Sequence, residues 1–376
     1  MRASRWLGLA TACLVLCSPL PGHTAETIKL GVPGAHSGDL AGYGTPALNA
    51  AKLVVEKYNA AGGIHGKMIE IVQQDDQCKP ELATNAATKL IAEGVQIVMG
   101  HTCSGATKAA LPLYEDKKVV SLSPSATSPE LTQSGKFAHF FRTTPSDDAQ
   151  ARLGADFVLK GLQAKKVAIL HDKGDYGKGY AEFVKEFIEK DGGAQVVFFE
   201  GITPGAVDYS SAVQKIGRSG ADTLVFGGYY PEASKLLTSI KSRKMQINFV
   251  SEDGAKTDSL IQLAGADSEG MYASSSRDNS ELAVAKTAAE EHEKTFGAKP
   301  GQFFELSYAA TQALLNAVDK NGGNTDPEGL IKALRSEYVD TPVGKIRFDE
   351  KGDCEGAGFA MFRVENGKFV DQNFQQ

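Results

Sequence analysis

The chain has 376 residues, of which 42% are hydrophobic and 23% are charged, a composition typical of a soluble globular protein. This length exceeds one ordinary hydrophobic core and is enough for two domains. The formal net charge of −6 and the pI near 5.7 argue against a nucleic-acid partner, because a protein that binds a phosphate backbone needs a basic surface.

The first 25 residues have the pattern of a cleaved secretory signal peptide. Two arginines precede an apolar run from Trp6 to Cys17, and Ala25 offers a small residue for cleavage. The run is too short for a stable membrane span, and no later segment is long and apolar enough. We therefore expect a periplasmic protein without a membrane span. A lipoprotein anchor on Cys13 or Cys17 is the competing interpretation.

Strand-like and helix-like segments alternate along the rest of the chain. Strands are expected at 27–31, 67–73, 95–99, 119–122, 166–170, 194–199, 223–226 and 247–250. Helices are expected at 45–61, 79–93, 179–190, 209–219, 231–242, 281–295 and 302–321. A further helix after Cys103 should be short or kinked because it contains Pro112. The tail at 358–370 predicts a β-hairpin that turns at residues 365–367.

This alternation predicts an α/β fold of two lobes, each a parallel-rich sheet flanked by helices. The expected division is a signal peptide at 1–25, a first lobe at 26–145 plus 277–355, and a second lobe at 146–276 plus 356–376. Several crossovers between the lobes would form a hinge, with a ligand cleft at the carboxyl ends of the strands.

Three cysteines remain after the signal peptide, in an oxidising compartment where disulfides persist. Cys78 and Cys103 follow neighbouring predicted strands, and the ends of such strands are close enough for a disulfide. The bridge would close a loop of about 25 residues and stabilise the fold by about 3 kcal/mol. Cys354 is left without an assigned role.

Small polar turns follow two neighbouring strands in the stretch 100–132. Ser104 and Thr107 lie in the first turn, and Ser125 and Thr127 lie in the second, each beside an expected helix start. Helix starts bind anions because their first N–H groups lack intrahelical partners and the helix dipole adds partial positive charge. Neither turn contains Lys or Arg, so a small carboxylate suits the site better than a polyphosphate. The stretch predicts a carboxylate-binding wall of the cleft.

Motifs for catalysis or metal binding are weak. The segment GGIHGK at 62–67 lacks the spacing of a phosphate loop, and no G-x-S-x-G sequence occurs. The acidic pairs at 75–76 and 252–253 have no His or Cys at metal spacing. We predict a binding protein that is not an enzyme and has no metal and no cofactor. A secreted hydrolase that uses Ser104 and His101 is an alternative, although no third orienting group is identifiable.

Several segments together resemble one known family. They are SGDLAGYG (37–44), NAAGGIHGK (59–67), QQDDQCKPE (73–81), GHTCSGAT (100–107), SPSATSPELT (123–132), FRTTPSDDAQ (141–150), HDKGDYGKG (171–179), FFEGIT (198–203), GGYYPE (227–232) and FDEKGD (348–353). With these segments the chain resembles the periplasmic branched-chain amino-acid-binding proteins of ABC transporters, the leucine/isoleucine/valine type. The resemblance covers almost everything after the signal peptide.

The resemblance implies a Venus flytrap fold with a Cys78–Cys103 bridge, and a monomer that closes on one free amino acid and delivers it to an inner-membrane ABC permease. It implies that the hydroxyls of Ser104 and Thr127, with neighbouring backbone N–H groups such as that of Ala126, hold the ligand carboxylate.

The same resemblance implies that the backbone carbonyl of Ser125 and the acidic side chain before Gly254 hold the ligand ammonium. Tyr43, Tyr176 and Tyr229 would line the side-chain pocket.

One position departs from the family pattern. The family often has Glu before the glycine, whereas this chain has Asp253, with Glu252 beside it. Either carboxylate is a candidate for the ammonium. Alternatives to leucine, isoleucine or valine are therefore a γ-amino acid, an aromatic amino acid or an amide.

Overall fold

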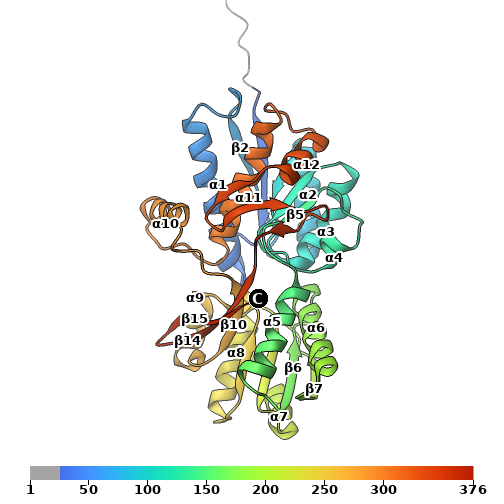
Figure 1. Cartoon of the computed structure of the whole chain (residues 1–376), viewed down its shortest axis with the longest axis vertical. Coiled ribbons are helices and arrows are strands. Elements are labelled where there is room, and N and C mark those ends of the chain that lie inside the picture. Colours follow the sequence, from blue (N-terminus) through green and yellow to red (C-terminus); the bar gives the residue numbers. More distant parts are fainter. Residues whose placement is uncertain (1–25, 376) are drawn as a thin grey trace, which may run out of the picture.

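The computed structural model describes residues 26–375, and the predicted signal peptide lies outside these residues. Helices and strands pack into two α/β bodies stacked along the long axis of the molecule (Figure 1). We call the body built on a five-stranded sheet the first lobe, and the body built on a seven-stranded sheet the second lobe. In the described part of the chain, no helix is long and apolar enough to cross a membrane.

The first lobe contains a fully parallel sheet with the strand order β2-β1-β3-β4-β5. Its strands are β1 (Ile28–Gly34), β2 (Ile69–Asp75), β3 (Ile97–Met99), β4 (Val120–Ser123) and β5 (Phe140–Arg142). Its helices are α1 (Ala41–Ala60), α2 (Pro80–Ala92), α3 (Ser104–Asp116), α4 (Glu130–Gln133), α10 (Ala283–Phe296), α11 (Phe304–Lys320) and α12 (Pro327–Ser336). A small sheet of β11 (Val339–Thr341), β12 (Gly344–Phe348) and β13 (Cys354–Glu355) completes it.

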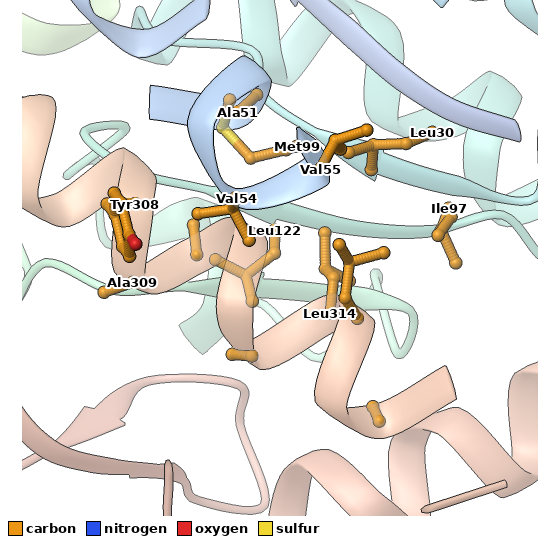
Figure 2. Packing of buried hydrophobic residues seen from close by; sticks show 14 of the residues in the cluster. Leu30, Ala51, Val54, Val55, Ile97, Met99, Leu122, Tyr308, Ala309 and Leu314 are labelled. Carbon is orange, nitrogen blue, oxygen red and sulfur yellow. The ribbon is translucent and has the colours of Figure 1, made fainter. Parts of the chain in front are cut away.

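Both faces of this sheet are covered, which explains why its strands are apolar without alternation. Ile97 and Met99 point to one face, where they pack with Val54 of α1 and Leu314 of α11 (Figure 2). Val98, one residue out of phase, points to the opposite face and packs with residues of α2 and α3. Two helical layers therefore bury a short parallel sheet between them.

The second lobe contains a mixed sheet with the order β15-β14-β10-β9-β8-β6-β7. Its parallel strands are β6 (Lys166–His171), β7 (Gln195–Gly201), β8 (Thr223–Gly227), β9 (Asn248–Ser251) and β10 (Tyr272–Ser276), and the antiparallel edge is β14 (Phe359–Glu365) and β15 (Lys368–Gln375). Its helices are α5 (Asp147–Asp156), which continues as a π-helical turn (Phe157–Gly161), α6 (Asp175–Asp191), α7 (Ser210–Ser219), α8 (Tyr230–Ser242) and α9 (Asp258–Ala264). Short 3-10 turns occupy Asp253–Ala255 and Gly265–Ser268.

The chain passes between the lobes after β5, after β10 and after β13. Two of these connections are tied together at Arg142, whose side chain is fully buried. Its Nε donates a 2.6 Å hydrogen bond to Asp353 Oδ1, and its backbone N–H donates to Gly352 at 2.9 Å. The waist between the lobes is therefore built from segments that are distant in the sequence.

The predicted α/β fold and its alternation of strands and helices are confirmed, with shifts of a few residues at the ends. The tail hairpin is also confirmed: Asn366 and Gly367 have φ values of 52° and 72°, as a two-residue turn with both central residues left-handed requires.

Two expectations differ from the structure. The helix after Cys103 was expected to be short or kinked, but it is not short: α3 has 13 residues and continues past Pro112 to Asp116. A proline removes only one helical N–H, and the packing of α3 against α2 and the sheet holds the helix together. The second polar turn does not open a helix, because the next helix, α4, has only four residues and begins at Glu130, after Pro129.

The predicted disulfide is confirmed. Cys78 and Cys103 are bonded, with their Cα atoms 5.4 Å apart. Cys354 is a half-buried free thiol in the small sheet, and burial raises its pKa to about 12. At neutral pH this thiol is protonated and therefore a poor nucleophile.

Candidate functional site

A narrow cavity lies between the two lobes at the carboxyl ends of their strands. The first lobe and the segment before α11 supply Tyr43, Thr102, Cys103, Ser104, Ser125 and Phe303, and the second lobe supplies Tyr176, Tyr229, Asp253 and Gly254. The free volume left between these side chains is about 10 Å³, so the two lobes are closed tightly on each other. The position of the cavity follows from topology, because parallel strands direct their following loops to one edge of a sheet.

The start of α3 forms one end of the cavity. Ser104 is the first residue of this 13-residue helix and is 1% exposed. The capping residue Cys103 makes no side-chain hydrogen bond to the helix, so the first backbone N–H groups are not occupied by a side-chain cap. This end of the cavity therefore carries hydrogen-bond donors and the positive end of a helix dipole.

The turn after β4 lies beside the start of α3. Ser125 lines the cavity, and its hydroxyl donates a 2.7 Å hydrogen bond to the carbonyl of Thr102. Ala126 does not line the cavity, and its N–H donates to the hydroxyl of Ser123 at 2.9 Å. Thr127 does not line the cavity either, and its hydroxyl is completely buried. The structure therefore brings Ser104 and Ser125 to the cavity surface, whereas Ala126 and Thr127 are buried outside its lining.

Asp253 forms the opposite end of the cavity. Its side chain is 2% exposed, and its Oδ1 accepts a 2.5 Å hydrogen bond from the hydroxyl of Tyr176. The same hydroxyl accepts a 2.7 Å hydrogen bond from the N–H of Gly254. A Cβ atom at Gly254 would lie 2.9 Å from the Tyr176 ring and 3.0 Å from the carbonyl of Gly228, so this close arrangement requires glycine.

Asp253 belongs to a buried group of acidic side chains. Burial raises the pKa of Asp253 to about 6, although hydrogen bonds from Tyr176 and Gln150 favour its ionised form. Burial raises the pKa of Asp147 to about 8, and the charge of Asp253 adds to this. Glu252 is also fully buried, and its pKa is raised by burial and by both aspartates. Strong shifts of this kind cluster at functional sites.

Asp147 is a candidate that the sequence reasoning missed. It begins α5 and is completely buried. Neither carboxylate oxygen meets ordinary hydrogen-bond geometry with a described residue, although the hydroxyl of Thr127 lies close enough to favour ionisation. A buried carboxylate with spare acceptor capacity is costly unless another group pairs with it. The only signal in the sequence was its place in the segment FRTTPSDDAQ.

The alternative carboxylate, Glu252, does not line the cavity. Its Oε1 accepts a 2.8 Å hydrogen bond from the N–H of Gly228, and its buried Oε2 has no hydrogen-bond partner among the described residues. Of the two neighbouring acids, Asp253 is the one that lines the cavity.

Aromatic rings form a continuous wall between the two ends. The rings of Tyr176 and Tyr229 stack with centroids 5.0 Å apart, and those of Tyr43 and Tyr229 are 5.9 Å apart. Phe303, which falls inside the helix expected at 302–321, instead precedes α11, and its ring centroid lies 5.3 Å from that of Tyr43. Tyr176 lies in the first turn of α6 and is buried.

Contacts across the cavity hold the lobes together. The hydroxyl of Tyr43, on α1, donates to the carbonyl of Gly254 in the second lobe. At the rim, Lys108 Nζ on α3 lies 2.9 Å from Asp175 Oδ1 at the start of α6. The structure therefore shows the closed arrangement of the two lobes.

The arrangement expected for a hydrolase is not formed. The ring nitrogens of His101 lie 2.5 Å from Asp76 Oδ2 and 3.0 Å from the hydroxyl of Tyr114. The hydroxyl of Ser104 accepts a 3.3 Å hydrogen bond from the N–H of Ser128. His101 is therefore turned away from Ser104 and cannot act as its base in this arrangement.

The site can bind a small molecule with opposite charges at its two ends. Donors at the start of α3 suit an anionic group, and the carboxylate of Asp253 suits a cationic group. The aromatic wall between them buries apolar surface. No Lys or Arg lines the cavity.

Comparisons with known proteins agree with this geometry. Residues 27–368 match the family model described as periplasmic binding protein. The leucine-specific-binding protein of Salmonella typhimurium is 34% identical over 352 residues, covering 94% of this chain and 95% of that protein. The Leu/Ile/Val-binding protein of Escherichia coli K12 is 35% identical, covering 90% of this chain and 91% of that protein.

Among solved structures, the branched-chain amino acid transporter substrate binding protein of Streptococcus pneumoniae, in complex with isoleucine, is similar. It superposes with a TM-score of 0.82 at 29% identity, covering 92% of this chain and all of that chain. The match of the family model to most of the chain and the identity to curated relatives lead to one conclusion. This chain belongs to the periplasmic binding protein family.

Proposed function

We propose that this protein binds a free aliphatic amino acid, namely leucine, isoleucine or valine, and delivers it to an ABC permease without chemical turnover. The observation that carries the proposal is one closed cavity with hydrogen-bond donors of a helix start at one end and a buried carboxylate at the other. The names of the relatives support the same ligand class.

The ligand carboxylate is assigned to the start of α3. The hydroxyl of Ser104 and the first backbone N–H groups of the helix would donate to it, and the hydroxyl of Thr127 would follow once the turn around Ala126 adjusts. A carboxylate needs several donors because burying an unpaired charge is costly. The fully buried Thr127 hydroxyl and the uncapped helix start support this assignment.

The ligand ammonium is assigned to Asp253, with the backbone carbonyl of Ser125 as a second acceptor. We add Asp147 to this set as a carboxylate behind Asp253: it does not line the closed cavity, but its buried oxygens retain acceptor capacity and it interacts electrostatically with Asp253. An ammonium group has three donors, so three acceptors satisfy it.

The aliphatic side chain is assigned to the aromatic wall. Tyr43, Tyr176, Tyr229 and Phe303 present ring faces, and the Cys78–Cys103 disulfide adds an apolar group nearby. The Tyr43 hydroxyl reaches Gly254 in the other lobe, so the pocket wall is completed only when the lobes close. Ligand contacts to both lobes would then stabilise the closed state.

The remaining proposals concern context. We propose export to the periplasm after removal of residues 1–25, a monomeric state, and an inner-membrane ABC permease as the partner. We also propose the lobe boundaries 26–145 plus 277–355 and 146–276 plus 356–376. The assignment of β14 and β15 to the seven-stranded sheet, and the packing of α11 on α1, support these boundaries.

Isothermal titration calorimetry on protein that has been unfolded, dialysed and refolded to remove retained ligand tests the proposal. The titrants are the twenty amino acids, γ-aminobutyrate, leucinamide and benzoate. We expect micromolar or tighter binding of at least one of leucine, isoleucine and valine. Tighter binding of γ-aminobutyrate or benzoate would show a different ligand class, and no binding of any titrant below millimolar would contradict the proposal.

A further inference from the structure

Three buried side chains, which are not among the proposed ligand contacts, form a hydrogen-bonded row next to the start of α3. His101 Nδ1 lies 2.5 Å from Asp76 Oδ2, and His101 Nε2 lies 3.0 Å from the hydroxyl of Tyr114. All three side chains are at most 1% exposed. Since both ring nitrogens are engaged, His101 does not contact a ligand itself, and its role must be indirect.

The backbone of His101 connects the two polar turns of the carboxylate wall. Its carbonyl accepts a 2.5 Å hydrogen bond from the Ser123 hydroxyl and lies 3.3 Å from the Thr107 hydroxyl, whose shorter hydrogen bond, 2.9 Å, goes to the carbonyl of Cys103. Thr107 lies on α3, whereas Ser123 ends β4 and its hydroxyl also accepts from the N–H of Ala126. A displacement of His101 would therefore move both turns relative to one another.

Asp76 anchors the segment 101–103 at both of its ends. Its Oδ2 meets the ring of His101, and its Oδ1 accepts a 2.8 Å hydrogen bond from the N–H of Cys78. Cys78 is bonded to Cys103, the residue that precedes Ser104. The ring contact and the disulfide together fix the path of the chain into α3.

We propose that His101 is a positioning residue for the ligand carboxylate. With Asp76 and Tyr114 it sets the separation between the start of α3 and the turn at 125–127, so that the two oxygens of one carboxylate meet donors from both turns. Hydrogen bonds weaken steeply when distance and angle are lost, so this separation matters for a two-oxygen group. The inference rests on the proposed function, because it presumes a carboxylate at Ser104.

The test compares leucine with leucinamide, which keeps the ammonium and the side chain but lacks the carboxylate. His101→Gln removes the ring that makes hydrogen bonds to both Asp76 and Tyr114, and leaves one of these two side chains without its partner. We expect the dissociation constant for leucine to rise about tenfold to a hundredfold, and that for leucinamide to change less than about threefold. The preference for leucine over leucinamide therefore falls about tenfold or more.

Tyr114→Phe is the milder variant and removes only the hydroxyl that faces His101. It should reduce the same preference by about twofold to fivefold, and it carries the test if His101→Gln does not fold. Thermal unfolding and circular dichroism establish that each variant is folded before titration. A general loss of stability would weaken both ligands alike, whereas a positioning role changes their ratio.

An unchanged leucine-to-leucinamide ratio in the folded variants, or an equal loss of both ligands, would overturn the role of His101. If the wild-type protein binds leucine and the variants show the same leucine-to-leucinamide ratio as the wild type, this inference fails while the proposed function stands. If the wild-type protein binds no carboxylate-bearing amino acid, the proposed function fails and the role of His101 fails with it.

Discussion

The hydroxyl of Tyr176 stands between Asp253 and Gly254, donating to the aspartate at 2.5 Å and accepting from the glycine N–H at 2.7 Å. This pairing orients a buried carboxylate towards the cavity and supplies one of the few hydrogen bonds that it has. The second lobe therefore presents its acceptor from a fixed position.

Asp253→Asn tests whether this carboxylate holds the ligand. We expect the affinity for leucine to fall by about 2–5 kcal/mol, because the ammonium loses its buried charged partner. Calorimetry measures the loss. Glu252→Gln is the matched control, since Glu252 bonds the N–H of Gly228 and does not line the cavity, and it should keep most of the affinity. The opposite ranking of the two variants would show that Glu252 is the true partner.

Tyr176→Phe tests the orienting hydroxyl. Loss of a hydrogen bond to a charged group costs about 1.5–3 kcal/mol, so we expect leucine affinity to fall about tenfold or more. The ring contact with Tyr229 is kept, so the aromatic wall persists. Tyr180→Phe, on the same helix and also buried, is the comparison variant, and it should bind leucine nearly as well as the wild type. Equal binding by the two variants would argue against an orienting role.

The stability of the ligand-free protein should depend on pH through Asp147 and Asp253. Their pKa values of about 8 and about 6 exceed the value of about 3.9 for an unfolded Asp. Between about pH 4 and these values, the folded protein therefore binds more protons than the unfolded protein. Their stabilising contribution is therefore complete below about pH 4 and is lost as the pH rises through about 6 to 8.

Thermal unfolding of the wild type and of Asp147→Asn between pH 5 and pH 8.5 measures this contribution. The melting temperature of the variant should fall less over this range than that of the wild type, because Asn does not ionise. A wild type and a variant with parallel pH profiles would exclude Asp147 as the source.

Ligand affinity should have the opposite pH dependence. An ammonium group prefers ionised carboxylates, so binding releases protons and strengthens as the pH rises, by up to about tenfold per pH unit for each carboxylate that must ionise. Titrations between pH 5 and pH 8, in two buffers of different ionisation enthalpy, measure both the affinity and the proton release. Proton uptake on binding would contradict this expectation.

The ion pair at the rim should contribute modestly to closure. Lys108 Nζ lies 2.9 Å from Asp175 in the other lobe and 2.8 Å from Glu130 in its own, and all three side chains are partly exposed. An exposed pair of this kind is worth about 0.2–1 kcal/mol, so Lys108→Ala should weaken leucine binding by up to about fivefold.

The loss in Lys108→Ala should shrink as the salt concentration rises, because ions screen exposed charges. Lys185→Ala breaks a pair with Glu189 inside α6 and is the matched control, with no expected effect on binding. Equal effects of the two substitutions would mean that the rim pair has no part in closure.

Regular elements were predictable from the sequence because their signals are local. Apolar runs such as residues 97–99 predict buried strands. The pair Asn366-Gly367 predicts a hairpin because both residues readily adopt the left-handed backbone conformation that the turn requires. Neighbouring strand ends likewise predicted the Cys78–Cys103 bridge. Where tertiary packing outweighs a local tendency, as in the helix that continues past Pro112, the sequence alone does not predict the length of the helix.

The site was only partly predictable for the same reason. Ser104, Ser125 and the three tyrosines stand in turns or at helix starts that the sequence and the family resemblance indicate. Asp147 resembles an ordinary helix-start aspartate until the fold buries it and places it near Asp253. The partners of His101 are 25 and 13 residues away, and only the completed sheet brings them together.

A crystal structure of the refolded protein with leucine, isoleucine or valine gives the sharpest test of a zwitterion held between the two lobes. We predict a ligand carboxylate within about 3 Å of Ser104 Oγ and of an N–H group at the start of α3, and an ammonium within about 3 Å of the Asp253 carboxylate. A ligand bound elsewhere, or one whose ammonium and carboxylate both contact a single lobe, would contradict the proposed function.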